Sequence, residues 1–183
     1  MIRAFVGLSI PEPLAGTLEA LQTGLQVGRI VPPENFHITL AFLGEQPDMV
    51  LDELHSGLSL LSQTIFEIRI KGLGTFGVST PHHLFADVVP NAALASLQKK
   101  VRRVARDAGI DLPHKRFHPH VTLARFGQGL NGEGLIKLQD HIARRIGMAA
   151  GVAHAIEFSL FESRLGNGAP VYTALADYSL NPI

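Results

Sequence analysis

The sequence has no cysteine, no net charge and no long hydrophobic run, and each absence excludes a class of protein. Without cysteine the 183-residue chain cannot form disulfides, use a thiolate nucleophile or hold zinc through sulfur. Sixteen basic and sixteen acidic side chains cancel, so no global field attracts nucleic acid or a membrane, and any anionic ligand must be held by a local cluster. The first apolar run, residues 4–10, is too short to span a membrane. These features are compatible with a cytoplasmic protein.

The amino-acid composition is that of a folded globular protein. Hydrophobic residues make up 46% of the chain and charged residues 17%, which suits a buried interior and argues against disorder. A chain of 183 residues has room for one substantial core. We expect a single domain over residues 1–183, built as two lobes that share this core, and a monomer in solution.

Hydrophobic spacing along the chain alternates between the two-residue period of strands and the 3.6-residue period of helices. Proline and glycine separate the segments, and no linker or low-complexity stretch interrupts them. The pattern predicts an α+β fold with strands at residues 3–10, 36–43, 66–76, 82–89, 118–126, 155–165 and 170–180, a turn at 166–170, and helices at residues 12–25, 48–62, 91–109 and 133–146.

A short pattern, His-x-Thr-Leu-Ala, occurs twice in the chain, 83 positions apart. The eight-residue windows that start at His37 and His120 are identical at five positions. Each copy closes a longer unit with the same order of strand, helix and strand, over residues 3–44 and 83–127. The simplest interpretation is a duplicated β-α-β unit. Its copies would pair about a pseudo-two-fold axis and bring the two His-x-Thr strands face to face around a central cleft.

Alternate residues of a strand point to one face, so each copy of the pattern has a polar side and an apolar side. The polar side carries His37 and Thr39 in the first copy and His120 and Thr122 in the second. Near neutral pH one imidazole can be neutral while the other is protonated, so the pair can accept one proton and donate another. The threonine hydroxyls can donate to phosphate oxygens without adding charge. The four side chains indicate in-line phosphoester cleavage without a metal cofactor, with a bell-shaped dependence of rate on pH.

An arginine, Arg125, follows the second copy and offers a bidentate guanidinium contact to the same phosphate. The alternation of side chains along the strand opposes this contact, because the fifth residue after His120 points to the opposite face of a regular strand. Arg125 therefore reaches the cleft only if the strand twists, bulges or ends before it. The first copy has Phe42 at the same place. We expect Phe42 and Phe5 to pack in the core, although either could stack on a base.

Other histidines and basic residues allow different interpretations. His118 and His120 could share a strand face as zinc ligands, although the sequence supplies no nearby carboxylate. The basic run at residues 99–106 suits an exposed helix face better than an RNA platform, although it could touch a long substrate. The histidines at turns or on helix faces are expected to be solvated: His55, His82, His83, His141 and His154. The twin histidines remain the strongest candidate site.

The two motifs, "HITL" at residues 37–40 and "HVTL" at residues 120–123, resemble those of the two-histidine phosphoesterase superfamily. Within it, the chain is similar to the RNA 2′,3′-cyclic phosphodiesterases, also called 2′-5′ RNA ligases. The middle hairpin at residues 72–88 and the closing hairpin at 158–175 extend the resemblance over almost the whole chain. Phe85 stands where that family often has tryptophan, which keeps the hydrophobic role and loses the indole donor, so the base preference stays open.

The resemblance implies a bilobal α+β fold, no metal cofactor, and hydrolysis of a nucleoside 2′,3′-cyclic phosphate to a 2′-phosphate. It implies that His37 gives a proton to the departing 3′ oxygen and that His120 is the base that activates water. Thr39 and Thr122 would hold the phosphate, with Arg125 assisting. The expected partners are RNA ends or small nucleotides that carry a 2′,3′-cyclic phosphate, with no membrane involved.

Two alternative functions use the same cleft. A nucleotide- or RNA-binding module would bind the phosphate without turnover, and a reversible 2′-5′ RNA ligase would accept a 5′-hydroxyl in place of water. Shared ancestry alone also explains a repeated motif, with structural roles for both histidines. Apart from the resemblance, the residues do not distinguish the acid from the base.

Overall fold

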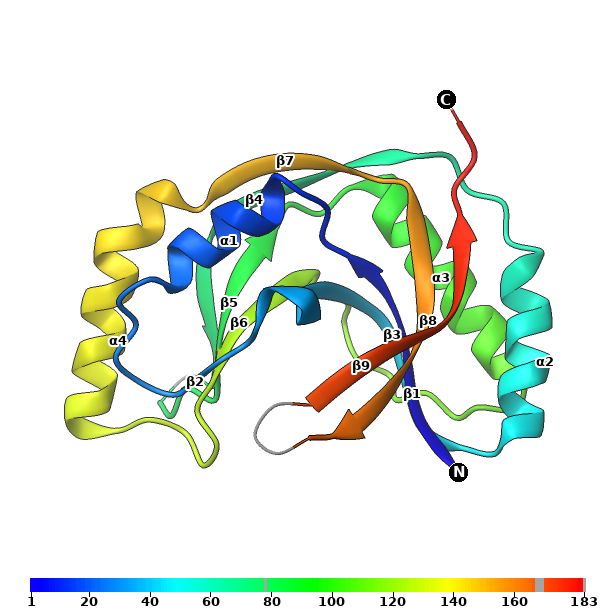
Figure 1. Ribbon diagram of the computed structural model, residues 1–183, viewed down its shortest axis with the longest axis horizontal. Helices are drawn as coiled ribbons and strands as arrows, with labels where there is room; N and C mark the ends of the chain where they lie inside the picture. The colour runs from blue at the N-terminus through cyan, green and yellow to red at the C-terminus, as the bar shows by residue number, and fades with distance from the viewer. Residues whose placement is uncertain (78, 167–169, 183) are drawn as a thin grey trace.

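An antiparallel sheet forms the centre of the molecule, and α-helices cover it at both ends (Figure 1). The computed structural model describes every residue except 78, 167–169 and 183. The described strands are β1 (Ile2–Ser9), β2 (Arg29–Ile30), β3 (His37–Gln46), β4 (Phe66–Phe76), β5 (His83–Val88), β6 (His120–Arg125), β7 (Ala150–Ala155), β8 (Glu157–Leu165) and β9 (Pro170–Ser179). The described helices are α1 (Leu14–Gln22), α2 (Asp48–Ser59), α3 (Ala92–Asp107) and α4 (Gly132–Arg145), with 3₁₀ segments at Pro33–Asn35 and Ile146–Met148. The predicted α+β fold is confirmed, and none of these helices is both long and apolar enough to cross a membrane.

The strands and helices expected from hydrophobic spacing are all present, with ends shifted by a few residues. Sequence reasoning missed the two-residue β2 and the edge strand β7, whose residues AGVAHA are mostly small and alternate weakly. β7 forms a strand because it pairs along its whole length with β4, from Phe66↔Ala155 to Lys71↔Ala150. Most of the turn expected at 166–170 lies outside the described residues.

The strand order places the two repeats on either side of the centre of the sheet. The order is β7-β4-β5-β6-β3-β1-β8-β9, and β2 pairs with β6 off this path. The first repeat supplies β1, α1 and β3, and the second supplies β5, α3 and β6, so the order reads alike outward from the β6–β3 junction. At that junction Ile38 pairs with Val121 in antiparallel register. The two His-x-Thr strands thus lie side by side in one sheet, and not face to face as the repeat had suggested.

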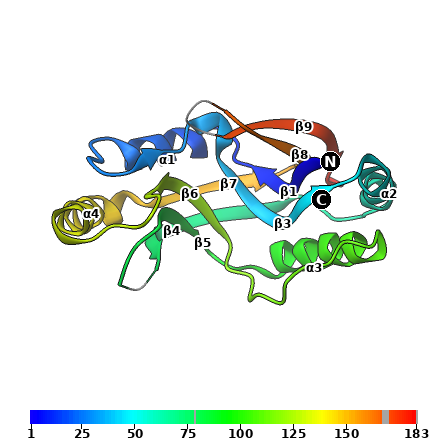
Figure 2. The same ribbon diagram turned by 90° about the horizontal axis from the view of Figure 1, so that it is seen from below.

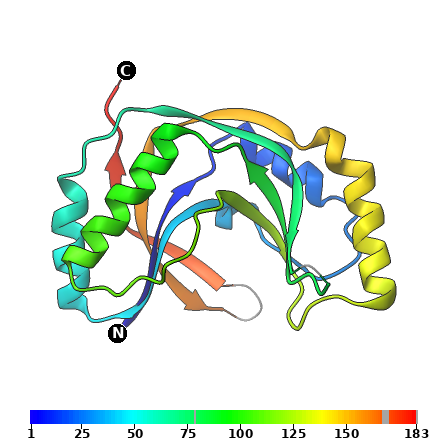
Figure 3. The same ribbon diagram turned by 180° about the vertical axis from the view of Figure 1, so that it is seen from behind.

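The helix of each repeat packs on the half of the sheet that contains the strands of the other repeat. α1 packs against β6 and β7, at the same end of the molecule as α4 (Figure 1). α3 packs against β3, and α2 contacts α3 and β9 at the opposite end (Figure 3). The apolar stripes of the two helices are buried, at Leu14, Leu18 and Leu21 in α1 and at Leu94, Leu97 and Val101 in α3. The two repeats therefore contribute to one continuous hydrophobic core.

A β-bulge interrupts each His-x-Thr strand at the same leucine of the motif. Consecutive residues of β1 pair with Thr39 and Ala41, so Leu40 is the extra residue of β3. In β6 the extra residue is Leu123, at the equivalent position. One extra residue reverses the alternation of the side chains that follow it.

A buried glutamine from the helix of the opposite repeat bonds each bulge. The amide nitrogen of Gln22, at the end of α1, donates to the carbonyl oxygens of Leu123 at 2.8 Å and Val31 at 2.7 Å. The amide nitrogen of Gln98, in α3, donates to the carbonyl oxygen of Leu40 at 3.4 Å. Because a buried carbonyl left without a donor costs on the order of 1–3 kcal/mol, these bonds stabilise the two irregular strands.

Replacing Gln22 by leucine is expected to lower the free energy of unfolding by about 2 kcal/mol, because the new side chain cannot donate to the Val31 carbonyl. Urea unfolding followed by circular dichroism measures the change. Gln26→Leu is the matched control, since Gln26 is exposed and its replacement should change the stability by less than about 0.5 kcal/mol. Equal losses of stability in the two variants would show that the buried hydrogen bonds of Gln22 do not stabilise the fold.

Candidate active site

Both motif histidines are fixed by the same kind of contact. Nδ1 of His37 lies 2.7 Å from the carbonyl oxygen of Asn35, and Nδ1 of His120 lies 2.7 Å from the carbonyl oxygen of His118. A carbonyl oxygen only accepts hydrogen bonds, so each Nδ1 carries the hydrogen and donates it. Each Nε2 is then left to exchange a proton with a ligand.

The polar sides of β3 and β6 border two adjoining hollows, both lined by Thr39 and Phe42. One hollow, of about 380 Å³, contains His37 and Arg125 and reaches the β8–β9 hairpin. The other, of about 550 Å³, contains His120 and reaches α3 and the loop before β6. Figure 2 shows the β8–β9 hairpin and α3 on opposite sides of β3. Together the hollows form one groove with a motif histidine in each half.

The two motif threonines differ in their access to the groove. Thr39 lines both hollows, between the two histidines. Thr122 is partly buried, pairs with Phe85 of β5, and belongs to neither hollow as the described residues outline them. The structure therefore makes Thr39 the hydroxyl that a ligand in the groove meets first.

Arg125 enters the site through the bulge in β6. The extra residue, Leu123, reverses the alternation and turns Arg125 into the groove, where it lines the same hollow as His37. One of its terminal nitrogens donates to the hydroxyl of Tyr172 at 3.2 Å. The bulge is thus the irregularity that Arg125 needed in order to point into the groove.

A phenylalanine packs against the ring of each motif histidine. The ring centroids of Phe5 and His37 lie 4.6 Å apart, and those of Phe85 and His120 lie 5.3 Å apart. Phe5 is buried, as expected, but it also lines the hollow that contains His37. Phe42 is 49% exposed, so the core role expected for it is wrong. The bulge at the preceding leucine turns it into the groove as it turns Arg125 in the other repeat.

Tyr172 of β9 is a site residue that sequence reasoning missed. Its ring meets that of His37 edge-on, with centroids 5.2 Å apart, and that of Phe5 with centroids 4.9 Å apart. No local motif marks Tyr172, because the closing hairpin reaches the histidine only through the pairing of β8 with β1. Tyr172 therefore links His37 to Arg125, whose guanidinium bonds its hydroxyl.

Burial lowers the pKa of both motif histidines. The pKa of His37 is lowered to about 4, chiefly by loss of hydration and also by the positive charges of Arg125 and His120, while the bonded carbonyl acts in the opposite direction. Loss of hydration also lowers the pKa of His120, while its bonded carbonyl and the Asp87 carboxylate act in the opposite direction. An anion in the groove favours the protonated imidazole and so opposes these shifts.

The positions of His118 and His120 bear on the alternative of a bound metal. Their rings are stacked with centroids 6.1 Å apart. Contrary to the sequence expectation, a carboxylate is nearby, since an oxygen of Asp87 lies 3.3 Å from Nε2 of His118. Within the described ranges, however, no group of three or more His, Asp or Glu side chains is arranged to hold a metal ion. His118 and Asp87 therefore form a polar contact, and His118 lines the half of the groove that contains His120.

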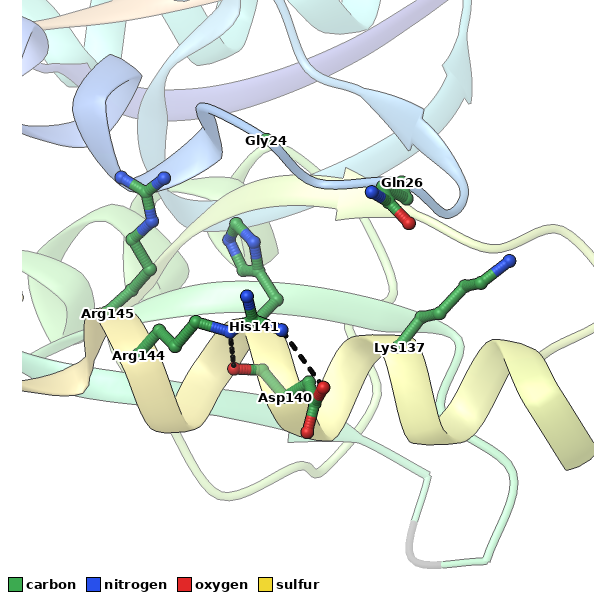
Figure 4. A pocket seen from close by; sticks show the side chains of 7 residues that line it. All are labelled: Gly24, Gln26, Lys137, Asp140, His141, Arg144 and Arg145. Carbon is green, nitrogen blue, oxygen red and sulfur yellow. Dashed lines mark hydrogen bonds and ion pairs between the residues drawn. The ribbon is translucent and has the colours of Figure 1, made fainter.

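His141 of α4 is buried, so the expectation that it is solvated is wrong. Its Nε2 donates to the carbonyl oxygen of Leu21 at 2.7 Å, and Nη1 of Arg145 donates to that of Ala20 at 2.9 Å. Both side chains extend from α4 toward the end of α1 (Figure 4). They satisfy carbonyl groups that the last turn of a helix leaves without partners. Of the other histidines expected to be solvated, His83 is partly buried and the exposed ones are His55, His82 and His154.

Comparison with known proteins assigns the chain to a family. Residues 10–133 match the 2′-5′ RNA ligase superfamily. The chain is 33% identical over 150 residues to an RNA 2′,3′-cyclic phosphodiesterase of Aeropyrum pernix, covering 80% of this chain and 83% of that protein. It is 31% identical over 192 residues to an RNA 2′,3′-cyclic phosphodiesterase of Thermus thermophilus, covering 98% and 90%. The crystal structure of E. coli LigT complexed with 3′-AMP has the same fold, with a TM-score of 0.75 at 24% identity over 98% of each chain.

The paired His-x-Thr strands lie at the centre of the antiparallel sheet of an α+β fold. They define a protein whose groove contains two histidines. With a family match over more than half of its length, the chain belongs to the 2′-5′ RNA ligase superfamily.

Proposed function

We propose that this protein is an enzyme that hydrolyses the 2′,3′-cyclic phosphate of RNA ends or nucleosides to a 2′-phosphate. The observation that carries the proposal is the pair of imidazoles, His37 and His120, held by equivalent carbonyl contacts in one groove. The names of the relatives from Aeropyrum pernix and Thermus thermophilus support this reaction, and the 3′-AMP complex of E. coli LigT supports a nucleotide ligand. The proposal includes a monomeric state and a cytoplasmic location.

In the proposed reaction, water attacks the phosphorus while the bond to the 3′ oxygen breaks on the opposite side. His120 takes a proton from the water, and His37 gives a proton to the 3′ oxygen, so the product carries a 2′-phosphate and a 3′-hydroxyl. The assignment of acid and base to these two histidines rests on the resemblance of the two motifs to those of the family. Thr39, Thr122 and Arg125 would donate hydrogen bonds to the other phosphate oxygens. The two imidazoles perform both proton transfers, so the proposal contains no cofactor.

The test is hydrolysis of a 2′,3′-cyclic mononucleotide with a metal chelator present, followed from pH 4 to 9, with the phosphate position of the product assigned by NMR. We expect a 2′-phosphate product, no effect of the chelator, and a bell-shaped profile. Because burial lowers the pKa of both histidines, the maximum of kcat/KM should fall below pH 6.5. Activity that the chelator removes would contradict the proposal and favour a metal at His118 and His120.

The same assay distinguishes the two alternative functions. Saturable binding of a nucleoside 2′-phosphate without turnover of any cyclic substrate would indicate a binding module. The name of the matched superfamily favours ligation as a second candidate activity. An RNA with a 5′-hydroxyl is therefore added beside an RNA with a cyclic end. A joined 2′-5′ product that the enzyme also cleaves would show the reverse reaction.

A further inference from the structure

A carboxylate, Asp87 of β5, lies beside the second motif histidine. Asp87 pairs with His120 across the ladder of β5 and β6, so the two side chains lie on one face of the sheet with their Cβ atoms about 5 Å apart. In the first repeat the residue that pairs with His37 is Ser9, which has no charge. The fold therefore does not require a carboxylate opposite a motif histidine.

His118 connects this carboxylate to His120. An oxygen of Asp87 lies 3.3 Å from Nε2 of His118. The ring of His118 is stacked with that of His120, with an angle of 21° between the ring planes. The backbone carbonyl of His118 also accepts the hydrogen on Nδ1 of His120. His118 thus contacts His120 through both its ring and its backbone, and Asp87 holds the ring from its other side.

Two phenylalanine rings pack against this pair of histidines. The centroid of Phe76 in β4 lies 5.7 Å from that of His118 and 4.7 Å from that of His120, with both rings met edge-on. The centroid of Phe85 in β5 lies 5.4 Å and 5.3 Å from the same two rings. Apolar rings in place of water weaken the screening of charge, so the Asp87 carboxylate acts on His120 more strongly than it would in solution.

The Asp87 carboxylate opposes surroundings that are otherwise neutral or positive. Among the described residues, no Asp or Glu lines either hollow of the groove. The other titratable or charged groups around the ring are His37 of β3, His83 of β5, Arg125 of β6, Arg102 of α3, and Lys115, Arg116 and His118 of the loop before β6. Burial lowers the pKa of His120 most and the positive charge of His118 lowers it too, while the His118 carbonyl and the Asp87 carboxylate raise it.

We propose that Asp87 is a positioning residue of the reaction: it holds the ring of His118 beside His120 and places a negative charge where the imidazolium of His120 forms. The inference rests on the proposed function, in which His120 takes a proton from water. A nearby carboxylate favours that transfer because it stabilises the charge that the ring gains. His37 has Arg125 in its half of the groove instead. The two equivalent imidazoles thus acquire different proton affinities, as an acid and a base require.

The test is an NMR titration of the His120 imidazole in the free protein, with the resonance assigned by its absence in His120→Asn. Asp87→Asn keeps an oxygen that can accept from His118 and removes the charge. We expect it to lower the pKa of His120 by about half a pH unit. His118→Gln keeps a nitrogen that can donate to Asp87 and removes a positive charge, so it should raise the pKa of His120.

Shifts in opposite directions distinguish this role from a structural one, because looser packing around His120 would move its pKa in the same direction in both variants. The limb of the pH profile of kcat/KM that follows His120 should move with the titrated pKa. Asp87→Glu restores the carboxylate and should return the pKa toward the wild-type value. A pKa of His120 that Asp87→Asn leaves unchanged would overturn the proposal.

Asp140→Asn is the matched control, since Asp140 is an exposed aspartate of α4 that also has a basic partner, Arg144, at 3.0 Å (Figure 4). It removes the same charge at the end of the molecule opposite α3 (Figure 1). The pKa of His120 should stay at its wild-type value in this variant. An equal shift in the control would show an effect of net charge alone and reject the role of Asp87.

The titration separates this inference from the proposed function, because it needs no turnover. If the wild type hydrolyses no cyclic nucleotide, the proposed reaction fails. Opposite shifts in Asp87→Asn and His118→Gln would then still show that these two residues control the proton exchange of His120. Their absence would reject that control as well.

Discussion

Replacing His120 by asparagine is expected to lower kcat for a 2′,3′-cyclic mononucleotide by about 10²–10⁴-fold. Asparagine keeps a donor for the His118 carbonyl and removes the Nε2 nitrogen that exchanges the proton. His37→Asn should cause a loss of the same order, because that ring has the equivalent contact. Initial rates at saturating substrate measure the effect, and circular dichroism verifies the fold. His154→Asn on the edge strand β7 is the control, since His154 is exposed and should be replaceable without loss.

The double variant His37→Asn/His120→Asn is expected to lose less than the product of the two single losses, because the two imidazoles act on one reaction together. Strictly multiplicative losses would indicate that the histidines act independently. A double variant that turns over the substrate at the wild-type rate would reject two-histidine catalysis altogether.

The free energy of unfolding is expected to fall by about 3 kcal/mol through His37 alone as the pH decreases from about 6.5 to about 4. Folding lowers the pKa of this imidazole from 6.5 to about 4, chiefly through burial. Between these values the unfolded chain binds a proton that the folded protein does not. The stability gained by keeping the ring neutral is complete above pH 6.5 and is lost as the pH falls.

Urea unfolding of the wild type and of His37→Asn at pH 7 and pH 4 measures this contribution. The difference in stability between the two pH values should be smaller in the variant by about 3 kcal/mol. A variant with the wild-type difference would show that His37 titrates normally in the folded protein.

The pKa of His37 also tests which histidine donates the proton. A general acid must hold a proton, so the donor role of His37 requires the bound phosphate to raise its pKa from about 4. An NMR titration of the imidazole with and without a nucleoside 2′-phosphate should show that increase. If the pKa of His37 stays near 4 while that of His120 rises, the roles of the two histidines are the reverse of those proposed.

The sequence was sufficient to predict the fold class and the pair of histidines, because both follow from local periodicity and from an internal repeat. It was not sufficient for Arg125, since strand alternation opposes its position and only the bulge at Leu123 reverses that alternation. Tyr172 was missed for a related reason, because it meets His37 only through strand pairing between distant segments. Burial of His141 likewise depends on the packing of α4 against α1.

The exchange of helices between the two halves of the sheet has a consequence for the origin of the fold. α1 packs against β6 of the second repeat and α3 packs against β3 of the first, so neither repeat contains a complete core. A one-repeat ancestor would have needed the helix of a second copy to bury its strands, as in a domain-swapped homodimer. In such a dimer each chain would have contributed one histidine to a symmetric groove. A single chain that holds both repeats can place Arg125 on one side and the aromatic ring of Phe42 on the other, which identical subunits cannot do.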